Sequence, residues 1–194
     1  MEMVRDGLEK LYTEEEYFAL EEQALDKHDF YNGKIIKRAE TNSNHNIICA
    51  NILAALVNAI ALKHKEYFVL TSDTKTYIPD PTNFLYPDAV VICEQIEPYP
   101  GSSTVITNPL LIVAVISTST EPQDRTSKFY DYKKISTFKE YFLVYQSIPS
   151  VTSFFKIGEH TWQDTDAAGM DNTIYLQSVD CTIDLKKIYR GIKF

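Results

Sequence analysis

Leu110-Leu111-Ile112-Val113-Ala114-Val115-Ile116-Ser117 decides how this chain folds. Every residue before the closing serine is apolar, and Val and Ile dominate. A near-continuous apolar run of this length is typical of a strand that is buried on both faces. The stretch therefore predicts a strand at the centre of a sheet, with other elements covering both sides.

Helices and a hairpin are expected on the amino-terminal side of this strand. Thr13 and Glu16 form a capping-box pattern that opens a helix. Asn32-Gly33 predicts a two-residue hairpin turn, because both positions tolerate positive φ. A second helix is expected from about Asn44 to His64. Its apolar stripe consists of Ile48, Ile52, Leu56 and Ile60.

Strands and one crossover helix are expected in the remainder. The helix should run from about Pro122 to Ile135. The predicted strands are Tyr67–Leu70 and Thr74–Ile78 (as one long strand or two short ones), Tyr86–Cys93, Lys139–Tyr145, Val151–Lys156 and a short one around Trp162, with a short helix over Asp184–Tyr189. This order predicts an α/β (α+β) fold, a mixed sheet flanked by helices, in one domain spanning residues 1–194.

Composition narrows the setting. The formal charge is −8, which argues against tight, unspecific binding of nucleic acid through net charge. Binding of DNA would need a local basic patch or a metal in an acidic cleft. The three cysteines are widely spaced without a CxxC pair, so we expect neither a disulfide scaffold nor a zinc site. No leader or membrane-spanning run is evident, and a cytoplasmic protein without a membrane partner is expected.

Polar residues that can carry chemistry stand beside these elements in a defined order. The set comprises Thr13 to Tyr17, Asp29 four residues before Gly33, His45, Pro87-Asp88, Ala114 to Ser117, and Asp124, Arg125 and Lys128. This ordered set resembles the putative restriction endonuclease family of the PD-(D/E)XK nuclease superfamily. Each motif alone is weak, but the order is specific, and the resemblance runs from about Thr13 to Phe194.

The resemblance implies a restriction endonuclease-like core with a curved sheet that hydrolyses DNA phosphodiester bonds with Mg²⁺ or Mn²⁺. Asp88 and Asp29 would be metal ligands, since magnesium prefers oxygen donors. Lys128 would supply the cation that the superfamily places on the strand, and His45 is a further catalytic candidate. Endonucleases of this fold often pair to cut both strands, so a homodimer is possible.

Two positions depart from the pattern. Ala114 stands where the family has Glu, and a methyl group cannot bind a metal. Ile116 stands where the superfamily has lysine. We therefore expect a weakened or inactive nuclease. The alternatives are a catalytically dead nuclease-like module that binds nucleic acid or protein, and a structural partner in a homo-oligomer.

Ordinary structural roles remain open for each candidate. Asp88 could be a turn residue before a strand, and Asp29 could be solvated beside the hairpin turn. Lys128 could pair with Asp124 on an exposed helix face, worth only about 0.2–0.5 kcal/mol. His45 could simply begin its helix. The basic residues of the helix and hairpin, which are Arg125, Lys128, Lys133, Lys134, Lys34, Lys37 and Arg38, could contact phosphates or be solvated.

Overall fold

The computed structural model describes residues 10–61, 63, 66–118 and 120–194. Its larger sheet has six strands. Their order is β11-β10-β9-β8-β6-β3. The strands are β3 (Tyr67–Thr71), β6 (Ala89–Cys93), β8 (Leu111–Ile116), β9 (Glu140–Tyr145), β10 (Ser150–Lys156) and β11 (Trp162–Ala168). Strand β8 pairs in parallel with β9 and antiparallel with β6. The apolar run therefore lies inside a mixed sheet, as its sequence predicts.

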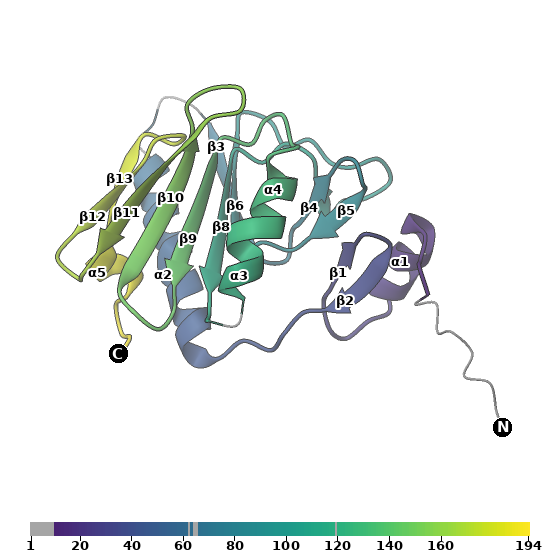
Figure 1. Cartoon of the computed structure of the whole chain (residues 1–194), viewed down its shortest axis with the longest axis horizontal. Coiled ribbons are helices and arrows are strands. Elements are labelled where there is room, and N and C mark those ends of the chain that lie inside the picture. The colour runs from purple at the N-terminus through teal and green to yellow at the C-terminus, as the bar shows by residue number, and fades with distance from the viewer. Residues whose placement is uncertain (1–9, 62, 64–65, 119) are drawn as a thin grey trace.

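Different elements cover the two faces of this sheet (Figure 1). One face packs against α2 (Ser43–Ile60), α5 (Leu185–Ile188) and the hairpin of β12 (Thr173–Leu176) and β13 (Cys181–Asp184). The other face packs against a helical segment made of α3 (Glu121–Gln123), a π-helical turn (Asp124–Lys128) and α4 (Phe129–Tyr132). Side chains of β8 alternate between the two: Val113 and Val115 face α2, whereas Ile112, Ala114 and Ile116 face α4.

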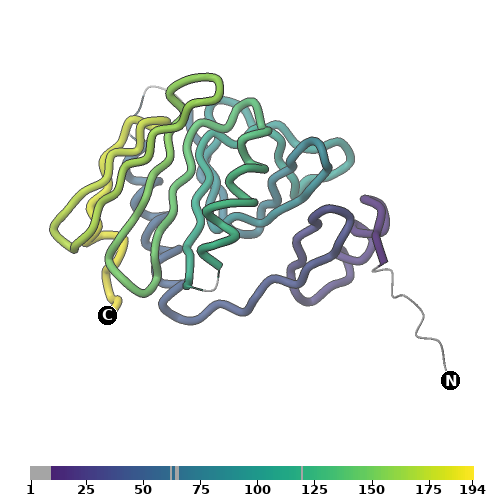
Figure 2. The backbone as a smooth tube through the Cα atoms, viewed as in Figure 1, coloured from purple at the N-terminus to yellow at the C-terminus, as the bar shows by residue number. Residues whose placement is uncertain are grey.

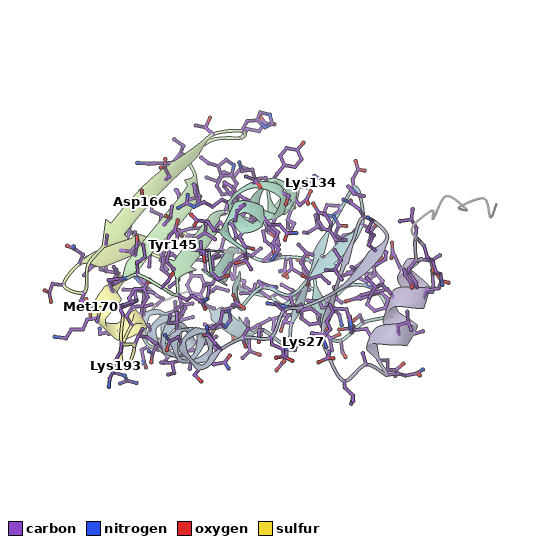
Figure 3. All side chains as sticks on the ribbon, turned by 60° about the horizontal axis from the view of Figure 1, so that its bottom comes forward. Lys27, Lys134, Tyr145, Asp166, Met170 and Lys193 are labelled. Carbon is purple, nitrogen blue, oxygen red and sulfur yellow. The ribbon has the colours of Figure 1, made fainter. Side chains whose placement is uncertain are left out.

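A smaller sheet has the order β2-β1-β5-β4-β7. Its strands are β1 (His28–Tyr31), β2 (Lys34–Lys37), β4 (Lys75–Ile78), β5 (Asn83–Leu85) and β7 (Val105–Ile106), and helix α1 (Glu14–Glu21) packs on it. The buried rings of Tyr17, Phe30 and Phe84 join helix and sheet. Residues 38–42 connect β2 to α2 and are called the strap below. Figure 2 shows that the chain is extended here as it passes from the smaller sheet to α2 at the larger sheet. Met170 and Lys193 lie at the end of the molecule opposite α1 (Figure 3).

The local predictions for the amino-terminal half are confirmed. The Thr13 side chain accepts from the N–H of Glu16, and the Glu16 carboxylate accepts from the N–H of Thr13. Asn32 and Gly33 have φ of 50° and 76°, as a two-residue hairpin turn requires. The four stripe residues of α2 are all buried. This helix ends at Ile60, and the expected end at His64 lies outside the described residues.

Of the two alternatives for residues 67–78, the two short strands are confirmed, and they lie in different sheets. Several other predicted boundaries were wrong. Strand β6 begins at Ala89 rather than Tyr86, since Pro87 has no N–H to donate to a ladder. The crossover helix ends at Tyr132 and contains the π-helical turn. Trp162 begins a strand of seven residues, and β5, β7 and the β12–β13 hairpin were not anticipated.

Candidate active site

A cleft of about 550 Å³ opens where the two sheets, the strap and the π-helical turn meet. Its walls include all five site residues expected from the family resemblance: Asp29, His45, Asp88, Ala114 and Lys128. They come from β1, the first turn of α2, the residue before β6, the middle of β8 and the end of the π-helical turn. Residues spread over about half of the chain thus line one concave site.

Asp88 brackets Ala114 on the neighbouring strand. Its backbone N–H donates to the Val113 carbonyl at 3.0 Å, and its Oδ2 accepts from the N–H of Val115 at 2.7 Å. Arg38 Nη2 lies 3.3 Å from the other carboxylate oxygen. Burial acts to raise the pKa of Asp88, but His45, Arg38 and the Val115 N–H outweigh it and hold the pKa below its usual range. Asp88 is therefore a buried, ionised carboxylate.

His45 connects Asp88 to helix α2. Its backbone N–H donates to the Asn42 side chain, which caps the helix. Its Nε2 lies 3.6 Å from Asp88 Oδ2, and its Nδ1 lies 3.5 Å from the Sγ of Cys49, one turn along the helix. The helix cap therefore orients the imidazole toward the Asp88 carboxylate.

Asp29 is tied to the segment that leads into β6. Its Oδ1 accepts from the N–H of Tyr86 at 2.9 Å, which holds β1 beside the approach to Asp88. Burial raises the pKa of Asp29, and the charges of Arg38 and Lys128 only partly counter this effect. The site thus contains two carboxyl groups with opposite pKa shifts, an arrangement common where acid–base or metal chemistry occurs.

Lys128 contacts Asp124 across the π-helical turn, with Nζ 2.9 Å from Oδ1. The pair is not on an exposed face: the side chains are 23% and 5% exposed, and both residues line the cleft. Single π-helical turns within α-helices frequently occur at functional sites. The turn brings a cation and a buried carboxylate together beside Asp29 and Asp88.

The wall around Ala114 is built partly of tyrosines. Ala114 is partly buried, and Tyr132 and Tyr141 line the cleft on the same face of the sheet. The hydroxyl of Tyr141 is buried and has no hydrogen-bond partner within the described part of the chain. Burial raises the pKa of both phenols far above the ordinary value, so both are neutral donors. The cleft therefore has an unused donor in its wall.

The donor set of the cleft fits a hard divalent cation. Asp29, Asp88 and Asp124 offer carboxylate oxygens, which magnesium prefers, and the remaining ligands can be water. A second set, His45, Cys49 and Asp88, has ligand atoms within 4.8 Å of one another. Burial and the Asp88 charge raise the pKa of the Cys49 thiol, which disfavours the thiolate that a thiophilic metal requires. By donor chemistry the oxygen set is the better match, although among the described residues the His45, Cys49 and Asp88 set alone has its ligand atoms within 4.8 Å of one another.

The basic residues expected on the helix and hairpin do not form one surface. Arg38 and Lys128 reach the cleft, and Lys37 lies at it while paired with Asp26. Arg125 instead donates to Tyr145 and Thr152. Lys133 lies over the ring of Phe129, and Lys134, labelled beside α4 in Figure 3, pairs with Asp131.

The sequence alone assigns no metal-binding or catalytic role to Asp124, Tyr132, Tyr141 or Arg38, and it names Arg38 only among the basic residues that could contact phosphates. Asp124 belongs to the motif that contains Lys128, but was considered only as an ion-pair partner. The sequence does not reveal that only 4% of Asp124 is exposed, because this burial follows from the packing of the helix on the sheet. Arg38 reaches Asp88 across 50 residues of chain, which no local pattern encodes.

The mixed sheet, the helices on its two faces and the cleft beside Asp88 and Ala114 define a restriction endonuclease-like fold. The crystal structure of a putative nuclease belonging to DUF820, from Anabaena variabilis ATCC 29413, has this fold, with a TM-score of 0.71, 12% sequence identity, and coverage of 90% of this chain and 96% of that one. Residues 14–185 match the family Uma2, described as "Putative restriction endonuclease". The chain belongs to that family.

Two relatives in Synechocystis sp. (strain ATCC 27184 / PCC 6803 / Kazusa) are similar along most of their length. Uncharacterized protein sll1609 is 34% identical over 160 residues, which cover 82% of this chain and 89% of that protein. Uncharacterized protein slr1290 is 30% identical over 181 residues, which cover 93% and 92%. Among the described residues, no helix has both the length and the apolar character needed to cross a membrane.

Proposed function

We propose that this protein is a metal-dependent DNA endonuclease whose activity is weakened at Ala114. Membership of the endonuclease family supports the reaction class. The observation that carries the proposal is the convergence of Asp29, Asp88, His45 and Lys128 on one cleft beside the Ala114 methyl. The family pattern has a carboxylate at position 114. Asp88 is held beside this position by hydrogen bonds to the backbone of Val113 and Val115.

Asp88 and Asp29 would hold Mg²⁺ or Mn²⁺, which when bound polarises the scissile phosphate and acidifies a water. The residues of the chain supply the rest. Asp88 is kept ionised by Arg38 and His45, so it can act as an anionic ligand at neutral pH. Lys128 and Arg38 place positive charge at the cleft, where a DNA phosphate would be bound and its developing charge stabilised. The carboxylate-poor site would bind metal through more waters and more weakly.

A second candidate is a nuclease-like module that binds DNA or protein without cutting. It is favoured by the internal neutralisation of the cleft: Arg38 pairs with Asp88, and Lys128 with Asp124. In that case Ala114 would mark a site that no longer assembles a metal. Two copies acting on opposite strands, as a homodimer, would suit the endonuclease but are not required by the binding module.

Cleavage of supercoiled plasmid DNA by the purified full chain tests the proposal. Nicking that requires Mg²⁺ or Mn²⁺, stops with a chelator, and falls at least ~10-fold in Asp88→Asn is expected. Asp184→Asn, which breaks an exposed ion pair with Lys187 outside the residues that line the cleft, is the matched control and should cut like the parent. DNA binding without nicking in any metal would instead support the binding module.

A further inference from the structure

A third carboxylate lies in the cleft, in addition to Asp29 and Asp88, the two expected metal ligands. Asp124 begins the π-helical turn and is 4% exposed. It lines the same cleft as Asp29, Asp88 and Ala114. Carboxylates are rarely buried to this extent unless they are paired or bind a cation. Lys128 provides one partner at 2.9 Å, to Oδ1.

The charge of Asp124 also affects the pKa values of other groups in the cleft. Its charge acts with burial to raise the pKa of Asp29, against the opposing charges of Arg38 and Lys128. Burial is the main cause of the raised pKa of Tyr141, and the charge of Asp124 is the next largest cause, ahead of Tyr132 and Asp88. Together with burial, the charges of Asp29, Asp124 and Asp88 all act to raise the pKa of the Tyr132 phenol, so the three carboxylates share one region of the cleft, and a divalent cation would relieve their repulsion.

Tyr141 gives independent evidence that something polar belongs here. It is fully buried, and its hydroxyl has no partner among the described residues. Tyr141 pairs with Ile112 across β8 and β9, so it lies on the same face as Ala114 and one diagonal position away. Buried hydroxyls nearly always have a partner in the protein, a water or a ligand. Tyr141 lines the cleft on the face of the sheet where β8 offers no carboxylate at position 114.

We propose that Asp124 supplies, from the helix, the carboxylate that β8 does not supply at Ala114, so that the cation site is formed by Asp29, Asp88 and Asp124. This inference rests on the proposed metal-dependent function. It changes the expected consequence of Ala114, because the site retains three acidic groups rather than two. The Tyr141 hydroxyl then serves as a donor to a water or ligand oxygen bound at this site.

The competing explanation is that Asp124 only positions Lys128. The two explanations predict different metal affinities. If Asp124 is a ligand, removing its charge weakens metal binding, and removing the Lys128 cation strengthens binding or leaves it unchanged. If Asp124 only anchors Lys128, the loss of its charge leaves metal affinity intact.

Mn²⁺ binding to the full chain, measured by calorimetry and by electron paramagnetic resonance without DNA, tests the proposal. Asp124→Asn should bind Mn²⁺ at least ~10-fold more weakly than the parent. Lys128→Met should bind at least as tightly as the parent. Asp131→Asn is the matched control, because Asp131 is equally buried at 4% and pairs with Lys134, but does not line the cleft; its Mn²⁺ affinity should be unchanged.

The double variant Asp124→Asn with Lys128→Met removes both partners and leaves no buried charge unpaired, so it protects the test against misfolding of the single variant. It should bind Mn²⁺ as weakly as Asp124→Asn. Recovery of the parent's affinity in the double variant, or parent-like affinity in Asp124→Asn, overturns the role of Asp124 while the proposed function stands. A parent that binds no Mn²⁺ contradicts both.

Discussion

Asp88 Oδ2 accepts a hydrogen bond of 2.7 Å from the N–H of Val115, while the Asp88 N–H donates to the carbonyl of Val113. Asp88 is thereby held to the β8 backbone on either side of Ala114, through its own N–H on one side and its carboxylate on the other. A side chain introduced at position 114 would enter the same cleft from the adjacent strand. This arrangement makes the consequences of several substitutions specific.

Ala114→Glu should restore a metal ligand. The new carboxylate would join Asp88 in the cleft, and we expect Mn²⁺ affinity and plasmid cleavage to rise at least ~10-fold. Because position 114 is partly buried, the added charge should lower the melting temperature without metal and raise its response to metal. Calorimetry and thermal melts check both effects. Ala114→Gln has the same size without the charge and should show neither gain; equal behaviour of the two variants would contradict a metal site here.

Asp88→Asn should destabilise the protein near neutral pH by about 1.5–3 kcal/mol, the range for a lost hydrogen bond to a charged group. The pKa of Asp88 is lowered on folding, so its stabilising contribution is present above the unfolded pKa of about 3.9 and is lost as the pH falls through the lower folded value. The difference between parent and variant should therefore shrink in acid. Urea unfolding across this range measures it, and a difference that does not depend on pH would contradict the ionised state of Asp88.

Asp29→Asn should have the opposite effect on stability. Burial raises the pKa of Asp29, so above the unfolded value of about 3.9 the folded state carries a cost for ionising this group. The amide oxygen can still accept from the N–H of Tyr86. We expect the variant to be more stable than the parent at pH 7 and equal to it below about pH 3.9. Added Mg²⁺ should stabilise the parent more than the variant; a less stable variant at pH 7 would rule out this explanation.

Tyr141→Phe should be neutral or stabilising in the absence of metal. Its hydroxyl has no partner within the described chain, so its removal deletes an unmet donor worth about 1–3 kcal/mol of desolvation. Tyr17→Phe is the matched control, because the buried Tyr17 hydroxyl donates to the His28 carbonyl at 2.8 Å. That variant should lose about 1 kcal/mol. Denaturant unfolding of both proteins makes the comparison, and a loss in Tyr141→Phe as large as in Tyr17→Phe would show that Tyr141 is satisfied.

Much of the fold follows from local patterns. The apolar run of β8, the stripe of α2 and the Asn32-Gly33 turn each specify a period or a backbone conformation that tertiary packing does not override. The short strands β5 and β7 lack such a pattern, since they have three and two residues. Pairing with neighbouring strands of the smaller sheet, rather than their own sequence, makes them strands.

The site was less accessible to sequence reasoning than the fold. The order of motifs identified residues of the cleft such as Asp88, because each motif lies at the end or centre of a predictable element. The partners of these residues depend on how distant elements pack. Arg38 meets Asp88 only because the strap carries it from the smaller sheet to the larger one. Asp124 lines the cleft from a π-helical turn of the crossover helix, which no local sequence pattern announces.

That turn has a consequence for how the family can diversify. A π-helical turn holds one residue more than the α-helical turn it replaces, so gain or loss of a single residue would rotate Asp124 and Lys128 relative to Phe129 and Tyr132 without disturbing the sheet. Strand β8 has no such freedom, because a one-residue shift would exchange its two faces. Evolution can therefore retune the helical wall of the cleft by insertion and deletion, but the wall formed by the strand only by substitution.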